Sequence, residues 1–470
     1  MDIALQNLLS LPILPLFLIL FTVFTIFWRT KTKSSNSKLP PGPPKLPLIG
    51  NLHQLGAMPH HGLAKLSHQF GPLMHIKLGA LSTVVVSSPE MAKEVMKTHD
   101  IAFANRPYLL AADVISYGSK GISFSPYGGY WRQMRKICTF ELLTPKRVES
   151  FKAIRDEEAS KLVKEVGLRE GSSMNLSKMI NSCSYGLTSS VAFGVLPVLT
   201  GLRSRVEKLH QEVDRILEKI VRDHRVTKET NEKEGEDLVD VLLKLQKQNN
   251  LEHPLSDNVI KATILDIFSA GSGTSAKTID WAMSELVKNP KVMEKAQSEI
   301  RRVFGEKGHV DEANLHEVKY LKSIIKETLR LHPPVPLLLP RECSERCEIN
   351  GYEIEAKSKV IVNTWAIGRD PNYWSDAEKF FPERFLDCSV DYKGADFQFI
   401  PFGAGKRMCP GITFGIANVE LLLANLLFHF DWKMPNGNKC EELDMTESFG
   451  LSVRRKQDLY LIPYIWHSFC

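Results

Sequence analysis

The chain has 470 residues, of which 43% are hydrophobic and 24% charged, a composition that is typical of a globular protein and excludes a disordered one. Its net charge of +6 is not gathered into a basic block, so no nucleic acid is expected as a partner. Eight cysteines are too sparse for a disulfide scaffold, and no internal repeat divides the chain after its N-terminal region.

Residues 1–28 are predicted to be an N-terminal membrane anchor. No charged residue lies between Ile3 and Trp28, and a helix of that length can cross a bilayer core of about 30 Å. Arg29 and three lysines follow directly, and positive charge stays on the cytoplasmic side, so the body is expected in the cytosol. A cleaved secretory signal fits less well, because its positive charge would precede a shorter apolar stretch.

Residues 29–44 form a basic and proline-rich hinge that ends in Leu39-Pro40-Pro41-Gly42-Pro43-Pro44. Proline fixes φ and cannot continue the membrane helix, so this segment predicts a stiff, non-helical spacer. Residues 45–470 are interpreted as one large domain.

The body is predicted to be mainly α with small β-sheets. Strands at Met74–Leu78 and Thr83–Ser87 suggest a hairpin, and Lys359–Trp365 is another strand candidate. Helical periodicity covers Arg147–Val166, Leu202–Arg225, Asp237–Lys247, Asn258–Lys288, Pro290–Phe304, Val318–His332 and Gly411–Phe428. The helix over Asn258–Lys288 is long and apolar through Ile260–Ala270, so we expect it to cross the interior and to border a pocket.

The most informative segment precedes the last predicted helix and reads Pro401-Phe402-Gly403-Ala404-Gly405-Lys406-Arg407-Met408-Cys409-Pro410-Gly411. Its glycines let the backbone approach a flat ligand closely and adopt positive φ. Cys409 is expected at a helix N-terminus, where N–H groups and the helix dipole favour a thiolate. The alternative is a glycine-rich turn with a buried cysteine.

This loop is similar to the haem-binding signature of the cytochrome P-450 family, and the likeness extends over nearly the whole chain. The resemblance implies a cytochrome P-450 fold and haem b with Cys409 as the iron ligand. It implies that Phe402 packs beside the sulfur, that Gly403 lines the haem and that Arg407 pairs with a propionate. A cysteine thiolate on haem iron favours O–O cleavage, which is the chemistry of oxygen activation.

Further motifs agree with the resemblance. Glu327 and Arg330 resemble the family's Glu-x-x-Arg pair, and Pro382-Glu383-Arg384-Phe385 resembles the companion motif whose arginine joins it. In the family, the equivalents of Trp131, Arg135 and Arg341 meet the haem propionates. Each of these residues taken alone would more simply have a core or surface role.

Ala270-Gly271-Ser272-Gly273-Thr274-Ser275 resembles the family's oxygen-activating motif, in which the hydroxyl of Thr274 would assist proton delivery. The alternative is a glycine-weakened helix in close contact with another element.

Two features of the sequence depart from the family's pattern. Gly273 stands where the family usually has Asp or Glu, and only Gly194–Gly201 connects two helices where members are generally a few tens of residues longer. The missing part would form much of the roof over the substrate.

The resemblance implies that one atom of O₂ enters a small lipophilic substrate and that NADPH supplies the electrons. Because no nucleotide fingerprint is present, a separate flavoprotein reductase is expected, with Arg132, Lys136 and Lys406 as candidate contacts. The likeness to plant microsomal enzymes of the A-type clade implies an endoplasmic reticulum membrane and a terpenoid, flavonoid, alkaloid or fatty acid substrate. Two alternatives stay open: a reductase-independent haem isomerase or dehydratase, and an inactive variant with a shortened roof.

Overall fold

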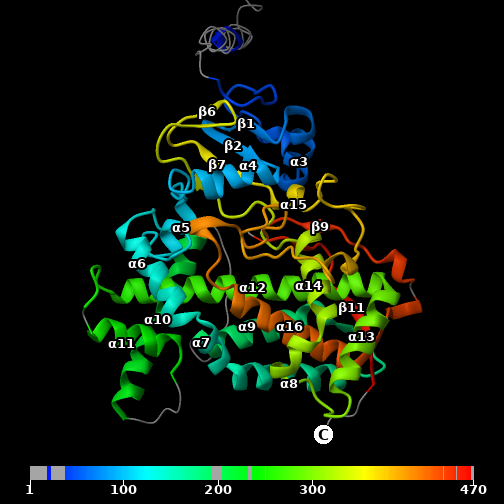
Figure 1. Cartoon of the computed structure of the whole chain (residues 1–470). Helices are drawn as coiled ribbons and strands as arrows, with labels where there is room; N and C mark the ends of the chain where they lie inside the picture. Colours follow the sequence, from blue (N-terminus) through cyan, green and yellow to red (C-terminus); the bar gives the residue numbers. More distant parts are fainter. Residues whose placement is uncertain are drawn as a thin grey trace, which may run out of the picture.

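A computed structural model of the chain describes residues 18–22, 38–192, 204–230, 236–248, 250–437, 439–450 and 452–466. Figure 1 shows a small sheet-bearing part with strands β1, β2 and β7 above a larger helical body, which agrees with the predicted mainly α composition. The connection Gly194–Gly201 lies outside the described residues, as does most of the predicted anchor. The seven cysteines within the described ranges are all free thiols.

The helices of the described ranges are α3 Pro59–Phe70, α4 Pro89–Lys93, α5 Leu110–Ile115, α6 Gly129–Ile137, α7 Pro145–Ser150, α8 Lys152–Gly167, α9 Leu176–Ala192, α10 Ser204–Thr230, α11 Leu238–Gln248, α12 Asp257–Lys288, α13 Pro290–Phe304, α14 Lys319–Leu331, α15 Thr364–Ile367 and α16 Ile412–His429. The strands are β1 Leu73–Leu78, β2 Leu81–Val86, β3 Met174–Asn175, β4 Arg341–Glu342, β5 Cys347–Ile349, β6 Tyr352–Ile354, β7 Lys359–Val362, β8 Phe430–Lys433, β9 Glu447–Ser448, β10 Arg454–Arg455 and β11 Tyr460–Ile465.

The largest sheet has the strand order β1-β2-β7-β4. The predicted hairpin is confirmed, since β1 and β2 pair antiparallel with Leu78 opposite Leu81. Strand β7 joins β2 in parallel and ends at Val362, so the strand prediction over Lys359–Trp365 was too long. The Asn363 side chain accepts the N–H of Ala366 and caps α15, and this local cap ends the strand.

Helix α12 crosses the middle of the molecule, as predicted (Figure 1). Ile260, Ile264 and Ile279 are fully buried, and α12 packs on α9 and on α16. This burial accounts for its apolar sequence, because a helix that is covered on most sides needs apolar residues around most of its surface. α12 is therefore a rigid base for any site on its exposed face.

The predicted helix over Arg147–Val166 is two helices, α7 and α8, which is a correction to the periodicity argument. Thr144 caps α7 by accepting the N–H of Arg147, and the chain breaks at Phe151, which has φ −89° and ψ 8°. The Phe151 side chain is buried in the core, so tertiary packing fixes the break.

Residues 41–44 form neither helix nor strand, and they are docked onto the body. The N–H of His75 in β1 donates to the carbonyl of Pro41 at 2.8 Å, and the Asn51 amide donates to the carbonyls of Pro43 and Pro44.

Within the described residues, α16 alone is long and apolar enough to cross a membrane by length and composition, and it is mostly buried inside the protein. Residues 18–22 of the predicted anchor are helical and exposed.

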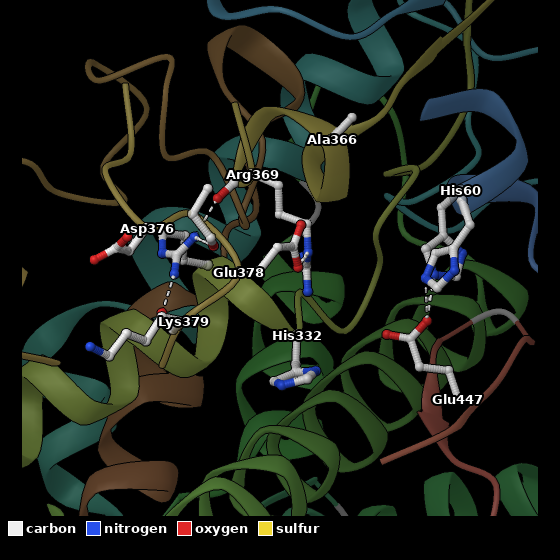
Figure 2. A network of polar contacts seen from close by, with 12 residues as sticks. His60, His332, Ala366, Arg369, Asp376, Glu378, Lys379 and Glu447 are labelled. Carbon is white, nitrogen blue, oxygen red and sulfur yellow. Dashed lines mark hydrogen bonds and ion pairs between the residues drawn. The ribbon is translucent and has the colours of Figure 1, made fainter. Parts of the chain in front are cut away.

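Two histidines of α3 contact a carboxylate near the C-terminal end of the body. His60 of α3, which is fully buried, lies 2.7 Å from a carboxylate oxygen of Glu447 in β9, and the exposed His61 lies 2.9 Å from the same oxygen (Figure 2). The two residues of the shorter contact are 387 positions apart in the sequence. Glu447 therefore ties the first helix of the body to its C-terminal strands.

Candidate haem and oxygen site

The cysteine loop folds tightly in front of α16. The N–H of Cys409 donates to the carbonyl of Phe402 at 3.0 Å, and the N–H of Gly411 points at the Cys409 sulfur at 3.4 Å. Gly405 has φ +67°, and a Cβ atom there would lie 2.1 Å from the carbonyl oxygen of Met96. Glycine is therefore required at 405, and the predicted turn with its cysteine before a helix is present.

Burial raises the pKa of the Cys409 thiol, and it outweighs the Gly411 N–H and the charge of Arg135, which both lower it. The helix start alone therefore does not produce the thiolate that the sequence led us to expect. A soft cation bound to the sulfur would stabilise the ionised form. The donor chemistry of this loop thus fits a metal ligand better than a free reactive thiol.

The basic residues predicted for a cofactor gather around this loop. The Arg407 guanidinium stacks over the Trp131 ring at 4.2 Å from its centre, and it donates to the carbonyls of Ala104, Ile122 and Ser125. The Trp131 indole N–H also donates to Ile122, at 3.0 Å. These donors are directed at main-chain carbonyls of the segment 104–125.

Two further arginines complete the cluster. Arg135 of α6 donates to the carbonyl of Met408, next to Cys409. Arg341 of β4 donates to the carbonyl of Ala404 at 2.8 Å and to Asp100 at 3.2 Å. The residues predicted from α6, β4 and the cysteine loop are therefore brought together, although they lie far apart in the sequence.

Positive charge in this cluster exceeds negative charge. Arg407 and Arg341 are buried, and within the described residues Asp100 is the carboxylate that forms an ion pair with this group. Burial and the neighbouring charges of Arg341 and Arg135 lower the pKa of Arg407 to about 9. A ligand with two carboxylates, such as the propionates of haem, would relieve this repulsion.

A buried ionic lock holds the segment 368–384, which precedes the cysteine loop in the chain. The fully buried Arg330 donates twice to Glu327 at 2.8 Å, and Arg384 donates to the same carboxylate at 3.0 Å. Arg330 also donates to the carbonyls of Gly368, Ala377 and Lys379, in the segment drawn in Figure 2. The lock fixes this segment against α14, as the paired motifs predicted.

The face of α12 toward the site is open at one place. Ser269 and Ala270 are exposed, whereas Phe268 and Ser272 are buried. The Thr274 hydroxyl donates to the carbonyl of Ala270 at 2.6 Å. A Cβ atom at Gly271 would lie 3.2 Å from the ring of Phe414 in α16, so α12 and α16 approach closely beside the site.

Sequence reasoning missed the contacts that Asp266 and Arg106 make. Asp266 of α12 accepts the N–H of Ser123 at 2.9 Å, and burial raises its pKa to about 6. Arg106 is buried and donates to the carbonyls of Ser123, Leu339 and Pro340. One signal was available, because Asp266 is an acid within the apolar run Ile260–Ala270. No local pattern marks Arg106.

The cysteine loop and the buried arginine cluster of this mainly helical fold suit a metal cofactor with acidic groups. The chain belongs to the cytochrome P450 family, whose model matches residues 40–196 and 195–462. It is therefore a haem-binding cytochrome P450 monooxygenase. The two matched segments meet at the start of the connection Gly194–Gly201.

Curated plant relatives are similar over nearly their whole length. Salviol synthase of Salvia pomifera is 51% identical over 97% of this chain and 98% of its own. Tabersonine 16-hydroxylase 1 of Catharanthus roseus is 50% identical over 93% and 94%. The alignment with salviol synthase has 494 positions, more than the 470 residues present here, so that relative has residues with no counterpart in this chain.

Among solved structures, a zebra fish cytochrome P450 with abiraterone has a TM-score of 0.78 and 24% identity. It covers 88% of this chain and 100% of the zebra fish chain. This likeness shows that the fold is that of a cytochrome P450.

Proposed function

We propose that this protein is a haem-thiolate monooxygenase that hydroxylates or epoxidises a small lipophilic plant-type metabolite, with Cys409 as the iron ligand. The observation that carries the proposal is the cysteine loop, which holds a partly buried sulfur beside Arg135 and in front of α16. Relatives named as a 16-hydroxylase and a 6,7-epoxidase support the reaction type. The substrate is proposed to be a terpenoid, flavonoid, alkaloid or fatty acid.

Each residue has a role in this proposal. Haem bound at Cys409 would supply the activation of O₂. Arg407, Trp131, Arg135 and Arg341 would hold its two propionates, which would balance the excess of buried positive charge. Phe402 and Gly403 would pack against its face, with Gly403 at φ +70° keeping the backbone close.

Thr274 would move a proton at the exposed part of α12. Its hydroxyl donates its one proton to the Ala270 carbonyl at 2.6 Å. If the hydroxyl turned away from this carbonyl, it could donate that proton toward the open side of α12 while its lone pairs accepted another. The exposed position of Ala270 leaves space beside it for O₂ and an apolar substrate.

Electrons would come from NADPH through a separate flavoprotein reductase. Arg132, Lys136 and Lys406 are all exposed, and they lie on α6 and the cysteine loop beside Arg135 and Cys409. An acidic surface on the reductase would fit this patch.

Residues 1–28 would anchor the protein in the endoplasmic reticulum membrane in a single pass, with residues 29–44 as a hinge and residues 45–470 in the cytosol.

The test is the reduced carbon monoxide difference spectrum of the full chain in microsomes. We expect the family's long-wavelength Soret band, its loss in Cys409→Ser and its retention in Cys440→Ser, a matched partly buried cysteine on another element. The same band in Cys409→Ser would refute the proposed ligand. A band that is formed without any reductase-dependent NADPH oxidation would favour the isomerase or dehydratase alternative, and no band in correctly inserted protein would favour the inactive one.

A further inference from the structure

One stripe of α12 connects the open part of the site with a lysine that sequence analysis did not consider. Ala270, Gly273, Thr274 and Lys277 are spaced at i, i+3, i+4 and i+7, which places them on one face of the helix. Ala270 is exposed at one end of this stripe, and Lys277 is partly buried at the other. Thr274 therefore lies between the open space and the lysine.

The Lys277 side chain folds back along the helix over Gly273. Its ammonium donates to the carbonyl of Gly273 at 3.0 Å. A Cβ atom at position 273 would lie 3.3 Å from Lys277 Nζ and 3.7 Å from the hydroxyl of Tyr185 in α9. The ammonium therefore fills the space that a side chain at 273 would enter, where related proteins usually place an acid.

The surroundings of Lys277 lower the pKa of its ammonium group, chiefly through burial. Burial lowers the pKa of Lys277 below its usual 10.5, the charge of Arg454 in β10 lowers it further, and Asp280 on the same helix opposes the shift. Lys277 has no ion pair within the described part of the chain. Tyr185 is 40% exposed, so solvent reaches the far side of this group.

We propose that Lys277 replaces the missing acid of the oxygen-activating motif as a positioning and proton-supplying residue that acts through Thr274. The Thr274 hydroxyl turns away from the Ala270 carbonyl and releases its proton into the open space beside Ala270, and a proton from the Lys277 ammonium replaces it on the hydroxyl oxygen. The resulting neutral amine regains a proton from solvent beside Tyr185, so Lys277 and Thr274 end each cycle unchanged. This inference rests on the proposed monooxygenase function.

The experiment measures peroxide and water formed per NADPH oxidised, by the full chain with a reductase in phospholipid vesicles and without added substrate. In Lys277→Met the ratio of peroxide to water should rise about tenfold or more, because positioned proton transfer contributes at least that much. Lys277→Arg should have the same raised ratio as Lys277→Met, because a guanidinium keeps the positive charge but does not release its proton in a protein. Wild-type coupling in Lys277→Arg would overturn the inference.

A second variant separates proton supply from packing. Adding Gly273→Glu to Lys277→Met should restore the low wild-type ratio, because an acid at 273 makes the lysine dispensable. A ratio that stays high in this double variant, with its carbon monoxide spectrum intact, would overturn the inference.

The ionisation of Lys277 can be followed without turnover. Acylation of Lys277 in the resting enzyme, measured by mass spectrometry as a function of pH, should be half-maximal below pH 10.5. A midpoint at or above that value would contradict the proposal. An intact carbon monoxide band with equal peroxide ratios in all variants would sink the role of Lys277 alone, whereas loss of the band in the wild type would sink the proposed function.

Discussion

Asp266 allows a quantitative test of how α12 holds the segment that binds Arg407. Asp266→Asn removes the charge but keeps an oxygen that can accept the Ser123 N–H, now at 2.9 Å. Burial raises the pKa of Asp266 from 3.8 to about 6, and the N–H groups of Ser123 and Ile122 only partly offset this rise. The folded protein therefore binds a proton at Asp266 more tightly than the unfolded chain does.

The sign of the pH effect follows from that difference. The unfolded carboxyl ionises above pH 3.8 and the folded one above about pH 6, so the contribution of Asp266 to stability falls as the pH rises between these values. At about 1.4 kcal/mol per unit of pKa, the full cost above pH 6 is about 3 kcal/mol. Between about pH 5 and pH 7.5, the wild type should lose about 1.5 kcal/mol relative to Asp266→Asn.

The assay is urea unfolding of the full chain in detergent, followed by tryptophan fluorescence at both pH values. As the pH rises, the free energy of unfolding of Asp266→Asn should increase relative to that of the wild type. This holds even if the unpaired amide lowers the free energy of unfolding of the variant at both pH values. Asp387→Asn, which replaces an exposed carboxylate, is the matched control. The reasoning is refuted if the difference between Asp266→Asn and wild type is the same at both pH values.

Two further predictions concern the support of the site and use the same urea assay. Gly405→Ala should cost about 2–5 kcal/mol, because its Cβ would collide with the Met96 carbonyl at a positive φ; Gly437→Ala, at φ +68° with nothing within 4 Å, should cost only about 1–2 kcal/mol. Equal losses in the two would contradict the close contact. Arg330→Met should cost about 3–5 kcal/mol, since it leaves a buried carboxylate short of partners, whereas the exposed Arg132→Met should stay within about 0.5 kcal/mol. A small loss in Arg330→Met would show that the lock contributes little to stability.

The long helices could be predicted because neighbouring residues in the sequence determine both their apolar spacing and their ends. Pro290 begins α13, and the predicted bounds Pro290–Phe304 are those observed. The predictions failed where one residue of the tertiary core or one cap decided the outcome. Buried Phe151 divides α7 from α8, and Asn363 turns the end of a strand into a helix.

The cysteine loop could be recognised as a unit, but its partners could not be derived from local patterns. Arg407 and Arg106 bind main-chain carbonyls, which every residue possesses, so sequence carries no mark of these contacts. Lys277 was overlooked for a related reason. The proposed role of Lys277 depends on its contact with Gly273 one helical turn away. A glycine and a lysine four residues apart on a helix do not predict this contact, which is seen only in the structure.

The contact between His60 and Glu447 has a consequence for the order in which the protein is made. At the usual rate of translation, the ribosome needs roughly 20 to 80 seconds to add the 387 residues that separate them. Strand β2 also waits for its parallel neighbour β7, which is synthesised much later. During that interval the N-terminal sheet has an open edge, which a holding chaperone would protect. A chain terminated between residues 412 and 446 would retain every residue of the cysteine loop and yet leave His60 without the Glu447 carboxylate.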